Sequence, residues 1–440
     1  MDPVIHSTEC LQVDGMLERS SKSQGVILPI ELCERIIDIC ALAPLASTGQ
    51  AFERFKSRAI TPQRPSVRFD LLRACALTCR GWRPRSQYHL FHDIHIRTKA
   101  DLTSLVSILR CNLKIRNCIK FLRLELDSPS AAFLLLQGQM PNLQELQVFA
   151  YTGHVFTISL HASSFAALKT FAHIKKLRLS EAYSNSTGLS LIRLLSLLPN
   201  LTHLQVDTMD EGSVTSPPRP TFYMPPFQLK SLIIGTCDKP LGTLAMLLAW
   251  LLKRPSAIDS LQTLWLDLGI PCDEEILEDG EVHKMLPYTG SSLQELGISH
   301  HSWSSDEKTQ CIPNNLNLSC MQKLQCLHFM GIMPQEMESI CRLLSTMTHP
   351  SLKRLNIEIY SNDDEQNISW AKLDEVLSSK VFQGLQTMNI RDHDIGAYKV
   401  VQDLDKKLPK LHLLGVLKQQ SVKETTIHGS WGFTELYSDS

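Results

Sequence analysis

Three histidines in the N-terminal quarter, His89, His92 and His95, are the first residues whose spacing could support metal chemistry, because imidazole is a common metal ligand. The alternation of apolar and polar residues around them predicts a strand, on which His92 faces away from the other two. Cys75 and Cys79 are four residues apart in a predicted helix, but small buried thiols explain them better than a metal site does. We therefore predict no metal site and no cofactor.

Signatures of catalysis are equally sparse. The sequence has neither the Gly-x-x-x-x-Gly-Lys-Ser/Thr loop that cradles phosphates nor the Gly-x-Ser-x-Gly turn of a serine nucleophile. His300 and His301 lie near Cys311, but no second pair of cysteines follows at zinc-binding spacing. We expect a binding protein and not an enzyme.

The charge balance argues against nucleic acid as a partner. The 440 residues include 44 Lys or Arg and 45 Asp or Glu, a net charge of −1, whereas nucleic-acid-binding domains carry a clear basic excess. The longest apolar run, residues 241–252, is shorter than the ~20 residues that span a bilayer, and residues 1–9 lack the pattern of a secretory signal. We expect an intracellular protein of the cytoplasm or nucleus, with reduced cysteines and no membrane contact.

A short phrase, apolar-x-x-apolar-x-apolar, recurs eleven times along the chain. Its first apolar residues are Ile119, Leu143, Ile174, Leu201, Leu229, Leu261, Leu293, Leu324, Leu352, Leu385 and Leu411. The residues two, four and six positions after each of these are mostly polar, and this alternation predicts a strand with one buried and one exposed face. Helical spacing between the phrases predicts crossovers and a parallel sheet.

The array resembles the leucine-rich-repeat family, whose repeats are 20–29 residues long; the average spacing here is about 29. The resemblance implies a curved solenoid with strands on its concave side and helices on its convex side. The position eight after each first apolar residue, where the family carries Asn, has no Asn in any repeat, so we expect an irregular solenoid. The proline-rich stretch 208–227 and the acidic stretch 272–281 are predicted loops, and residues 419–440 a flexible tail.

Residues 28–96 do not follow the repeat. Leu28-Pro29-Ile30-Glu31 opens a predicted helix, a second helix from Leu71 ends in Cys79-Arg80-Gly81-Trp82, and a strand is predicted within residues 88–96. These motifs resemble the F-box, although residues 41–70 would form an inserted loop that lengthens the module. We therefore predict an α/β protein: a disordered segment 1–27, an F-box-like helical module 28–96, and an irregular leucine-rich-repeat solenoid 97–418 of about eleven strand–helix repeats.

The F-box resemblance implies that the module docks a Skp-type adaptor, and through it a cullin, while the concave face binds a protein substrate for ubiquitination. The residues that match the family's adaptor-binding or supporting positions are Leu28, Pro29, Ile30, Leu32, Ile36, Ile37, Leu71, Leu72 and Trp82. The alternative is a leucine-rich-repeat scaffold or inhibitor with no role in a ubiquitin ligase.

We place the predicted substrate site at the centre of the concave face, because aromatic and Arg anchors dominate interfaces. Its candidate residues are Arg123, Arg178, Asp207, Ile233, Trp265, Asp267, Glu295 and His328. Trp265 is the only Trp at an exposed strand position; the alternative is that it packs against a neighbouring loop. A phosphate-dependent substrate would need clustered Arg, and Arg123, Lys176 and Arg178 are the only candidate cluster.

Overall fold

The computed structural model describes residues 29–42, 67–126, 129–149, 156–157, 162–183, 189–209, 227–237, 242–267, 281–299, 316–359, 369–394, 397–400 and 403–415. The predicted disordered segment 1–27, Leu28 and the predicted tail 419–440 lie outside these residues, as do residues 43–66 of the predicted insert and most of the two predicted loops.

One curved sheet of 13 strands runs through the molecule, and eleven of its strands are parallel. In spatial order these eleven are β1 (Asp93–Ile96), β2 (Phe121–Glu125), β3 (Glu145–Phe149), β5 (Lys176–Tyr183), β6 (His203–Met209), β7 (Ser231–Cys237), β8 (Thr263–Asp267), β9 (Glu295–Ser299), β10 (Cys326–Ile332), β11 (Arg354–Ile359) and β12 (Thr387–Asp394). Strand β13 (Ala397–Val400) pairs antiparallel with β12, and the short β4 (Phe156–Thr157) pairs with β5. The predicted alternation of strands and helices in an α/β fold is confirmed.

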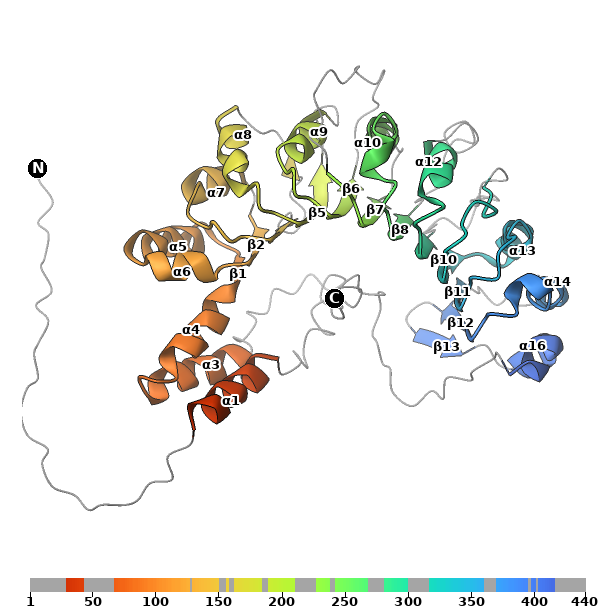
Figure 1. The fold of residues 1–440 in the computed structure, drawn as a ribbon, viewed down its shortest axis with the longest axis horizontal. Coiled ribbons are helices and arrows are strands. Elements are labelled where there is room, and N and C mark those ends of the chain that lie inside the picture. Colours follow the sequence, from red (N-terminus) through yellow and green to blue (C-terminus); the bar gives the residue numbers. More distant parts are fainter. Residues whose placement is uncertain are drawn as a thin grey trace, which may run out of the picture.

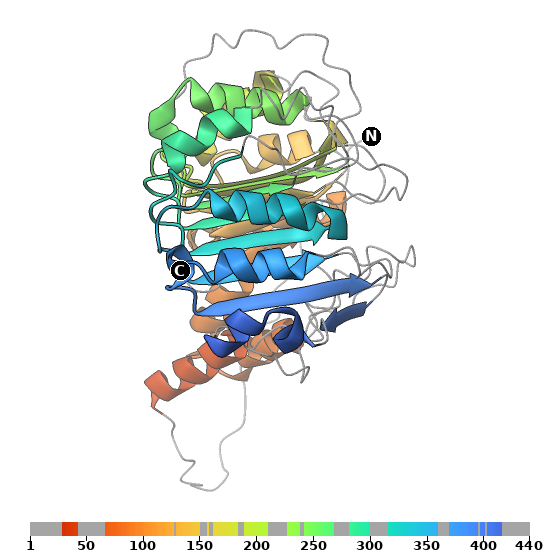
Figure 2. The ribbon, with the colours of Figure 1, turned by 90° about the vertical axis from the view of Figure 1, so that its right-hand side faces the viewer.

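Helices cover the outer side of this arc, and the strands line its inner side (Figure 1). The helices are α5 (Lys99–Cys111), α6 (Leu113–Cys118), α7 (Pro129–Leu136), α8 (Ala162–Leu168), α9 (Leu189–Ser196), α10 (Gly242–Leu252), α12 (Glu281–Thr289), α13 (Met337–Ser345), α14 (Trp370–Leu377), α15 (Leu404–Lys407) and α16 (Pro409–Leu413). Figure 2 shows helices and strands stacked in successive layers. The inner face is therefore made of strands alone.

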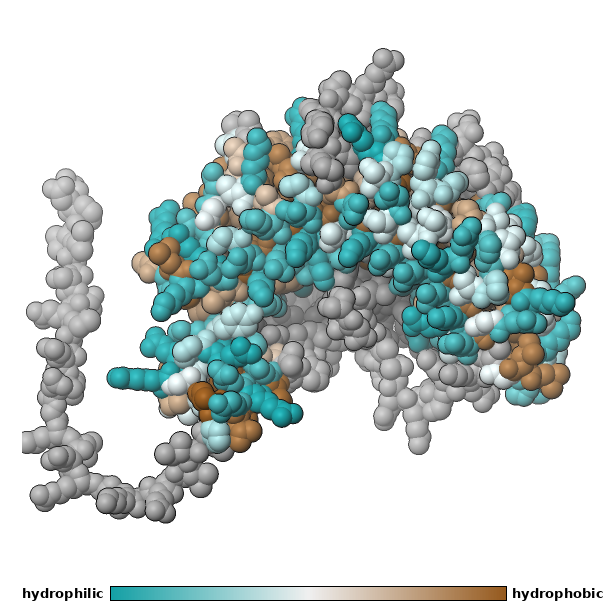
Figure 3. Space-filling model, viewed as in Figure 1, coloured by the Kyte–Doolittle hydropathy of each residue, from teal (hydrophilic) through white to brown (hydrophobic). Residues whose placement is uncertain are grey.

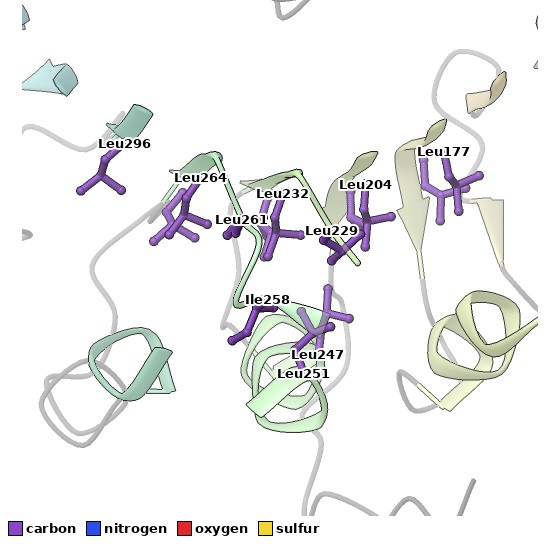
Figure 4. Close-up of a cluster of buried hydrophobic side chains, with 14 of the residues drawn as sticks. Leu177, Leu204, Leu229, Leu232, Leu247, Leu251, Ile258, Leu261, Leu264 and Leu296 are labelled. Atoms are coloured by element: carbon purple, nitrogen blue, oxygen red, sulfur yellow. The ribbon is translucent and has the colours of Figure 1, made fainter. Parts of the chain in front are cut away.

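The apolar residues of the repeated phrase form the core between sheet and helices. In the first ten repeats every one of them is buried, and all belong to one continuous cluster. Figure 4 shows strand residues such as Leu232 and Leu264 pointing toward Leu247 and Leu251 of α10. Burial of apolar surface, at about 25 cal/mol per Å², thus stabilises each repeat through its neighbours.

Polar side chains just before the first apolar residue of a repeat tie successive repeats together. Asn142 and Asn200 donate through Nδ2 to the carbonyls of Asn117 and Ala172 at 2.9 and 2.8 Å. Ser292 Oγ makes the same kind of bond, to Leu261 O at 2.8 Å. These bonds lie at the entrance to the strands, whereas the Asn position of the leucine-rich-repeat pattern lies beyond them.

The predicted eleventh strand, beginning at Leu411, is wrong. Residues 409–413 form the helix α16, with Pro409 in its first turn, where a missing N–H is harmless. The buried Asp374 carboxylate of α14 accepts hydrogen bonds from the N–H groups of Lys410 and Leu411 at 3.1 and 3.0 Å. This capping satisfies donors that a helix start otherwise leaves open, so the last described segment closes the array as a helix.

Residues 242–252 of the longest apolar run form α10, with Leu247, Leu248 and Leu251 buried. In the part of the chain that the structure describes, no helix combines the length and apolarity needed to cross a membrane.

The described residues of the N-terminal module form the helices α1 (Ile30–Leu42), α3 (Val67–Thr78) and α4 (Arg83–His92). The first two confirm the predicted helical pair, and they extend into both ends of the predicted insert 41–70. The strand predicted within residues 88–96 is wrong in its first half, because residues 83–92 are helical and only Asp93–Ile96 forms β1. Since α4 leads directly into β1, the first strand of the sheet, the module is joined to the array without an intervening linker.

Candidate functional site

The helical module has a small core of its own. Ile37 and Ala41 of α1 pack with Leu72 and Cys75 of α3, and Trp82 is among the partly buried residues around them. The two α1 residues are four positions apart and share one helix face. These few side chains hold together the two helices on which the predicted adaptor-binding residues lie.

The other face of this helical pair is apolar and exposed. Its large side chains, with their exposed fractions, are Ile30 48%, Leu32 47%, Ile36 40%, Ile39 60%, Leu71 42% and Leu77 86%. Figure 3 shows apolar residues at this end of the molecule. We call this group the module patch. Large apolar side chains left exposed in this way make this end of the molecule a candidate for contact with another protein.

A charged contact joins α1 to α4 beneath the patch. Arg85 Nε and Nη2 donate to the two carboxylate oxygens of Asp38 at 2.7 and 2.8 Å, and His89 Nε2 lies 2.8 Å from Asp38 Oδ1. The Arg85 hydrogen bonds, with help from His89, lower the pKa of Asp38 to about 2 even though partial burial opposes this shift. A two-pronged contact of this type fixes relative orientation, so α1 is held firmly on the module.

The predicted adaptor-binding residues divide into two groups in the structure. Ile30, Leu32, Ile36 and Leu71 belong to the module patch, and Pro29 is exposed next to it. Ile37 and Leu72 are fully buried in the module core, and Trp82 is half-buried against it, so these three support the fold of the patch. Sequence reasoning did not select Ile39 and Leu77, whose exposure could not be assigned before the partner helix was placed.

The concave face is less exposed than predicted. Ile233 is 0% exposed and Trp265 4%, and Gln205 and His328 are also buried. Neighbouring strands are only about 4.8 Å apart, and inward curvature brings side chains on the concave side still closer together. The expectation of exposed strand positions is therefore wrong at the centre of the array, where large side chains cover one another.

At the N-terminal end of the concave face, Phe149 lies between two predicted residues. The guanidinium carbons of Arg123 and Arg178 are 4.2 and 5.1 Å from the centre of its ring, a geometry of favourable cation–π contacts. Arg123 also pairs with Glu125 at 2.6 Å, as does His95 at 3.0 Å. Arg123 and Arg178, two of the three residues of the candidate phosphate-binding cluster, thus contact an aromatic ring, and Arg123 also pairs with a carboxylate of the same chain.

At the N-terminal end of the concave face, His95, Arg97 and Arg123 all contact the carboxylate of Glu125. Its burial alone would raise the pKa of the carboxyl, but the hydrogen bond from His95 and the charges of His95, Arg123 and Arg97 outweigh burial and lower the pKa to about 2. Glu125 therefore stays ionised and neutralises part of the local positive charge.

On the central strands β8 and β9 and the adjacent β10, the structure brings together Trp265, Glu295 and His328. Trp265 Nε1 and His328 Nε2 each lie 3.3 Å from Glu295 Oε1, and the two rings are stacked 4.8 Å apart. The indole lies over Gly297, where an added Cβ would come within 2.2 Å of two ring atoms. Trp265 thus packs across a glycine onto the next repeats, while most of the proline-rich stretch considered as its neighbour lies outside the described residues.

Three predicted substrate residues remain, and the strand pairings place the backbone of each. Ile233 pairs in register with Trp265 but is fully buried. The backbone of Asp207 pairs with Gly235, two positions before the end of the β6–β7 pairing, and that of Asp267 pairs with Ser299 at the last position of the β8–β9 pairing. The predicted site is therefore not one continuous surface.

A cleft that sequence reasoning missed lies over β10, β11 and β12. It is small, with room for little more than a water-sized group, and is lined on the concave side by His328, Met330, Asn356, Glu358, Asn389 and Arg391. The sequence feature that could have indicated this cleft is an Asn at the same strand position in two successive repeats, Asn356 and Asn389.

The histidines that first suggested metal chemistry are dispersed: His89 contacts Asp38, His95 contacts Glu125, and His92 ends α4. Within the described ranges, no group of three or more His, Cys, Asp or Glu side chains could hold a metal ion. Cys75 is buried as expected, whereas Cys79 is exposed beyond the end of α3.

No protein-family model matches this chain, and no curated protein matches its sequence.

Proposed function

We propose that this protein is a substrate-recognition adaptor of a Skp–cullin–F-box ubiquitin ligase. The helical module would dock the Skp-type adaptor, and the concave face of a leucine-rich-repeat solenoid would bind the protein substrate. The observation that carries the proposal is the module patch: six large apolar side chains exposed on the two helices that bear the F-box-like motifs.

The physical argument rests on the cost of leaving this patch in water. Burying apolar surface contributes about 25 cal/mol per Å², so a partner that covers the patch gains substantial binding free energy. Because α4 continues into β1, a partner on the patch and a substrate on the array would be held in a defined geometry. Such tethering raises the local concentration of substrate near the transfer machinery, and no catalytic group is needed on this chain.

The test is co-purification of the full chain with a Skp-type adaptor. Ile36→Asp places a charge in the patch at a side chain that is 40% exposed, so the fold should tolerate it while adaptor binding falls at least tenfold. The matched control is Leu413→Asp on α16, an apolar side chain 85% exposed at the opposite end of the array.

Equal adaptor recovery from both variants and the wild type would contradict the docking surface. Failure of the wild-type chain to retain the adaptor would favour the alternative, a repeat scaffold or inhibitor with no ligase role.

A further inference from the structure

The cleft over β10–β12 is part of a hydrogen-bonded row that crosses five strands. Trp265, Gly297, His328, Asn356 and Asn389 occupy equivalent positions on β8 to β12 and pair in register from one strand to the next. The row begins in the buried contact of Trp265 with Glu295 and ends in half-buried amides. It therefore connects the buried centre of the array to an open surface.

The direction of the hydrogen bonds in this row follows from Glu295. A carboxylate only accepts, so His328 Nε2 donates to it at 3.3 Å. Asn356 Nδ2 lies 2.9 Å from His328 Nδ1, and because an amide nitrogen only donates, His328 Nδ1 accepts this hydrogen bond. Asn356 Oδ1 in turn accepts from Asn389 Nδ2 at 2.7 Å. Each amide orientation is thus fixed by the one before it.

The row leaves a defined set of groups open at the cleft. An amide has two N–H donors and an oxygen with two acceptor positions, and the row uses only one N–H of each Asn. The second N–H of Asn356 and of Asn389 and the oxygen of Asn389 make no hydrogen bond to any residue in the described part of the chain. The cleft therefore offers donors and an acceptor side by side.

This pattern matches one class of ligand. A peptide group carries one N–H donor and one C=O acceptor, and it can satisfy both kinds of open group at once. A phosphate offers only acceptors: Arg391, which lines the cleft, would attract it, but the Glu358 carboxylate and the Asn389 oxygen at the same cleft would oppose it. The cleft has room for little more than a water-sized group, so a ligand meets it with single main-chain groups of an extended segment and not with a folded surface.

We propose that the cleft over β10–β12 binds an extended peptide segment of a partner protein through its main chain, with Asn356 and Asn389 bonding to its peptide groups. The identification of that partner as the ligase substrate rests on the proposed function; the binding chemistry does not. The site lies three to four strands beyond the predicted centre at Trp265, whose buried contact with Glu295 anchors the row.

The experiment uses the full chain and a phage library of randomised twelve-residue linear peptides. We expect selection to recover peptides whose affinity for the protein falls by about tenfold or more in each of the variants Asn389→Leu and Asn389→Asp. Both substitutions remove the amide donor, and Asn389→Asp does so while keeping the shape of the side chain. The matched control is Gln147→Leu on β3, an amide at the same strand position near the other end of the array, which should change affinity less than about twofold.

N-methylation of single peptide bonds in a selected peptide separates main-chain from side-chain recognition. One or two N-methyl positions should abolish binding, while alanine at most side-chain positions should be tolerated. The proposal is overturned if no peptide is recovered, if Asn389→Leu and Asn389→Asp bind like the wild type, or if inorganic phosphate displaces the peptides. Co-purification with the Skp-type adaptor tests the module independently of the cleft. If the chain binds peptides but not the adaptor, the ligase role is rejected and the peptide-binding proposal stands.

Discussion

The helical module and the repeat array use similar apolar side chains in opposite ways. In the array, apolar strand residues meet a helix and the neighbouring repeats, and they form one buried cluster from Ile96 to Leu411. In the module, four residues make the buried core, and larger Ile and Leu side chains remain exposed on α1 and α3. The array therefore gains its stability through stacking, whereas the module leaves large apolar side chains exposed.

The largest expected effect separates these two uses of leucine and isoleucine. Leu264 in β8 is 0% exposed, and Leu264→Ala should lower the free energy of unfolding by about 3 kcal/mol, within the range for buried Leu→Ala changes. Ile39→Ala in the module, at a side chain 60% exposed, should cost less than about 0.5 kcal/mol. Urea unfolding followed by circular dichroism measures both, and similar losses would contradict the contrast.

The next effect concerns close approach of the backbone. Gly297→Ala places a Cβ about 2.2 Å from two ring atoms of Trp265, so the indole must move, and overpacking of this kind costs about 1–3 kcal/mol. At Gly81 in the module the nearest atom to a new Cβ would be Ile30 Cδ1 at 3.7 Å, an ordinary contact. Thermal unfolding with Trp fluorescence should show a lower midpoint for Gly297→Ala alone; an unchanged midpoint and spectrum would be inconsistent with the Trp265 packing.

Much of the fold follows from the sequence because strand alternation is a local property. The ten strands β2, β3 and β5–β12 follow a repeated phrase whose buried and open positions depend on the period of two alone. Leu411 fails this rule because Asp374, 37 residues earlier, caps the segment as a helix. That contact joins residues that are distant in sequence, and no local pattern reveals it.

The candidate sites were harder to predict for the same reason. The burial of Ile233 and Trp265 depends on the curvature of the sheet and on the side chains of adjacent repeats, and Gly297 makes room for the indole. The hydrogen-bonded order of Asn356 and Asn389 depends on Glu295, which lies two and three strands away from them. The strand positions of Trp265, Asn356 and Asn389 follow from the repeated phrase in the sequence, whereas the contacts between repeats do not.

A smaller effect depends on pH and belongs to the array. Burial, with the charges of Lys176 and Lys230, lowers the pKa of His203 to about 4 from 6.5. The unfolded chain thus takes up the proton first, and the free energy of unfolding falls as the pH drops from about 6.5 to about 4. Because His203 is only half-buried, we expect a loss of about 1–2 kcal/mol after solvent screening. His203→Gln should remove this component from urea midpoints measured between these pH values; an identical slope in the variant would count against it.

The smallest effect tests how firmly α1 is held in the module. Asp38→Asn removes the charge that Arg85 and His89 contact, and since the Asp38 side chain is 33% exposed we expect a loss of about 1 kcal/mol at neutral pH. The folded-state pKa of Asp38 is about 2, below its ordinary value of 3.8, so this stabilisation is present above pH 3.8 and disappears as the pH falls toward 2. Amide hydrogen exchange in α1 should therefore be faster in Asp38→Asn at pH 7, while the array amides around Leu264 are unaffected. Faster exchange in both regions would mean that the module and the array unfold together, and equal protection of α1 in both proteins would show that the Asp38 contact does not hold the helix.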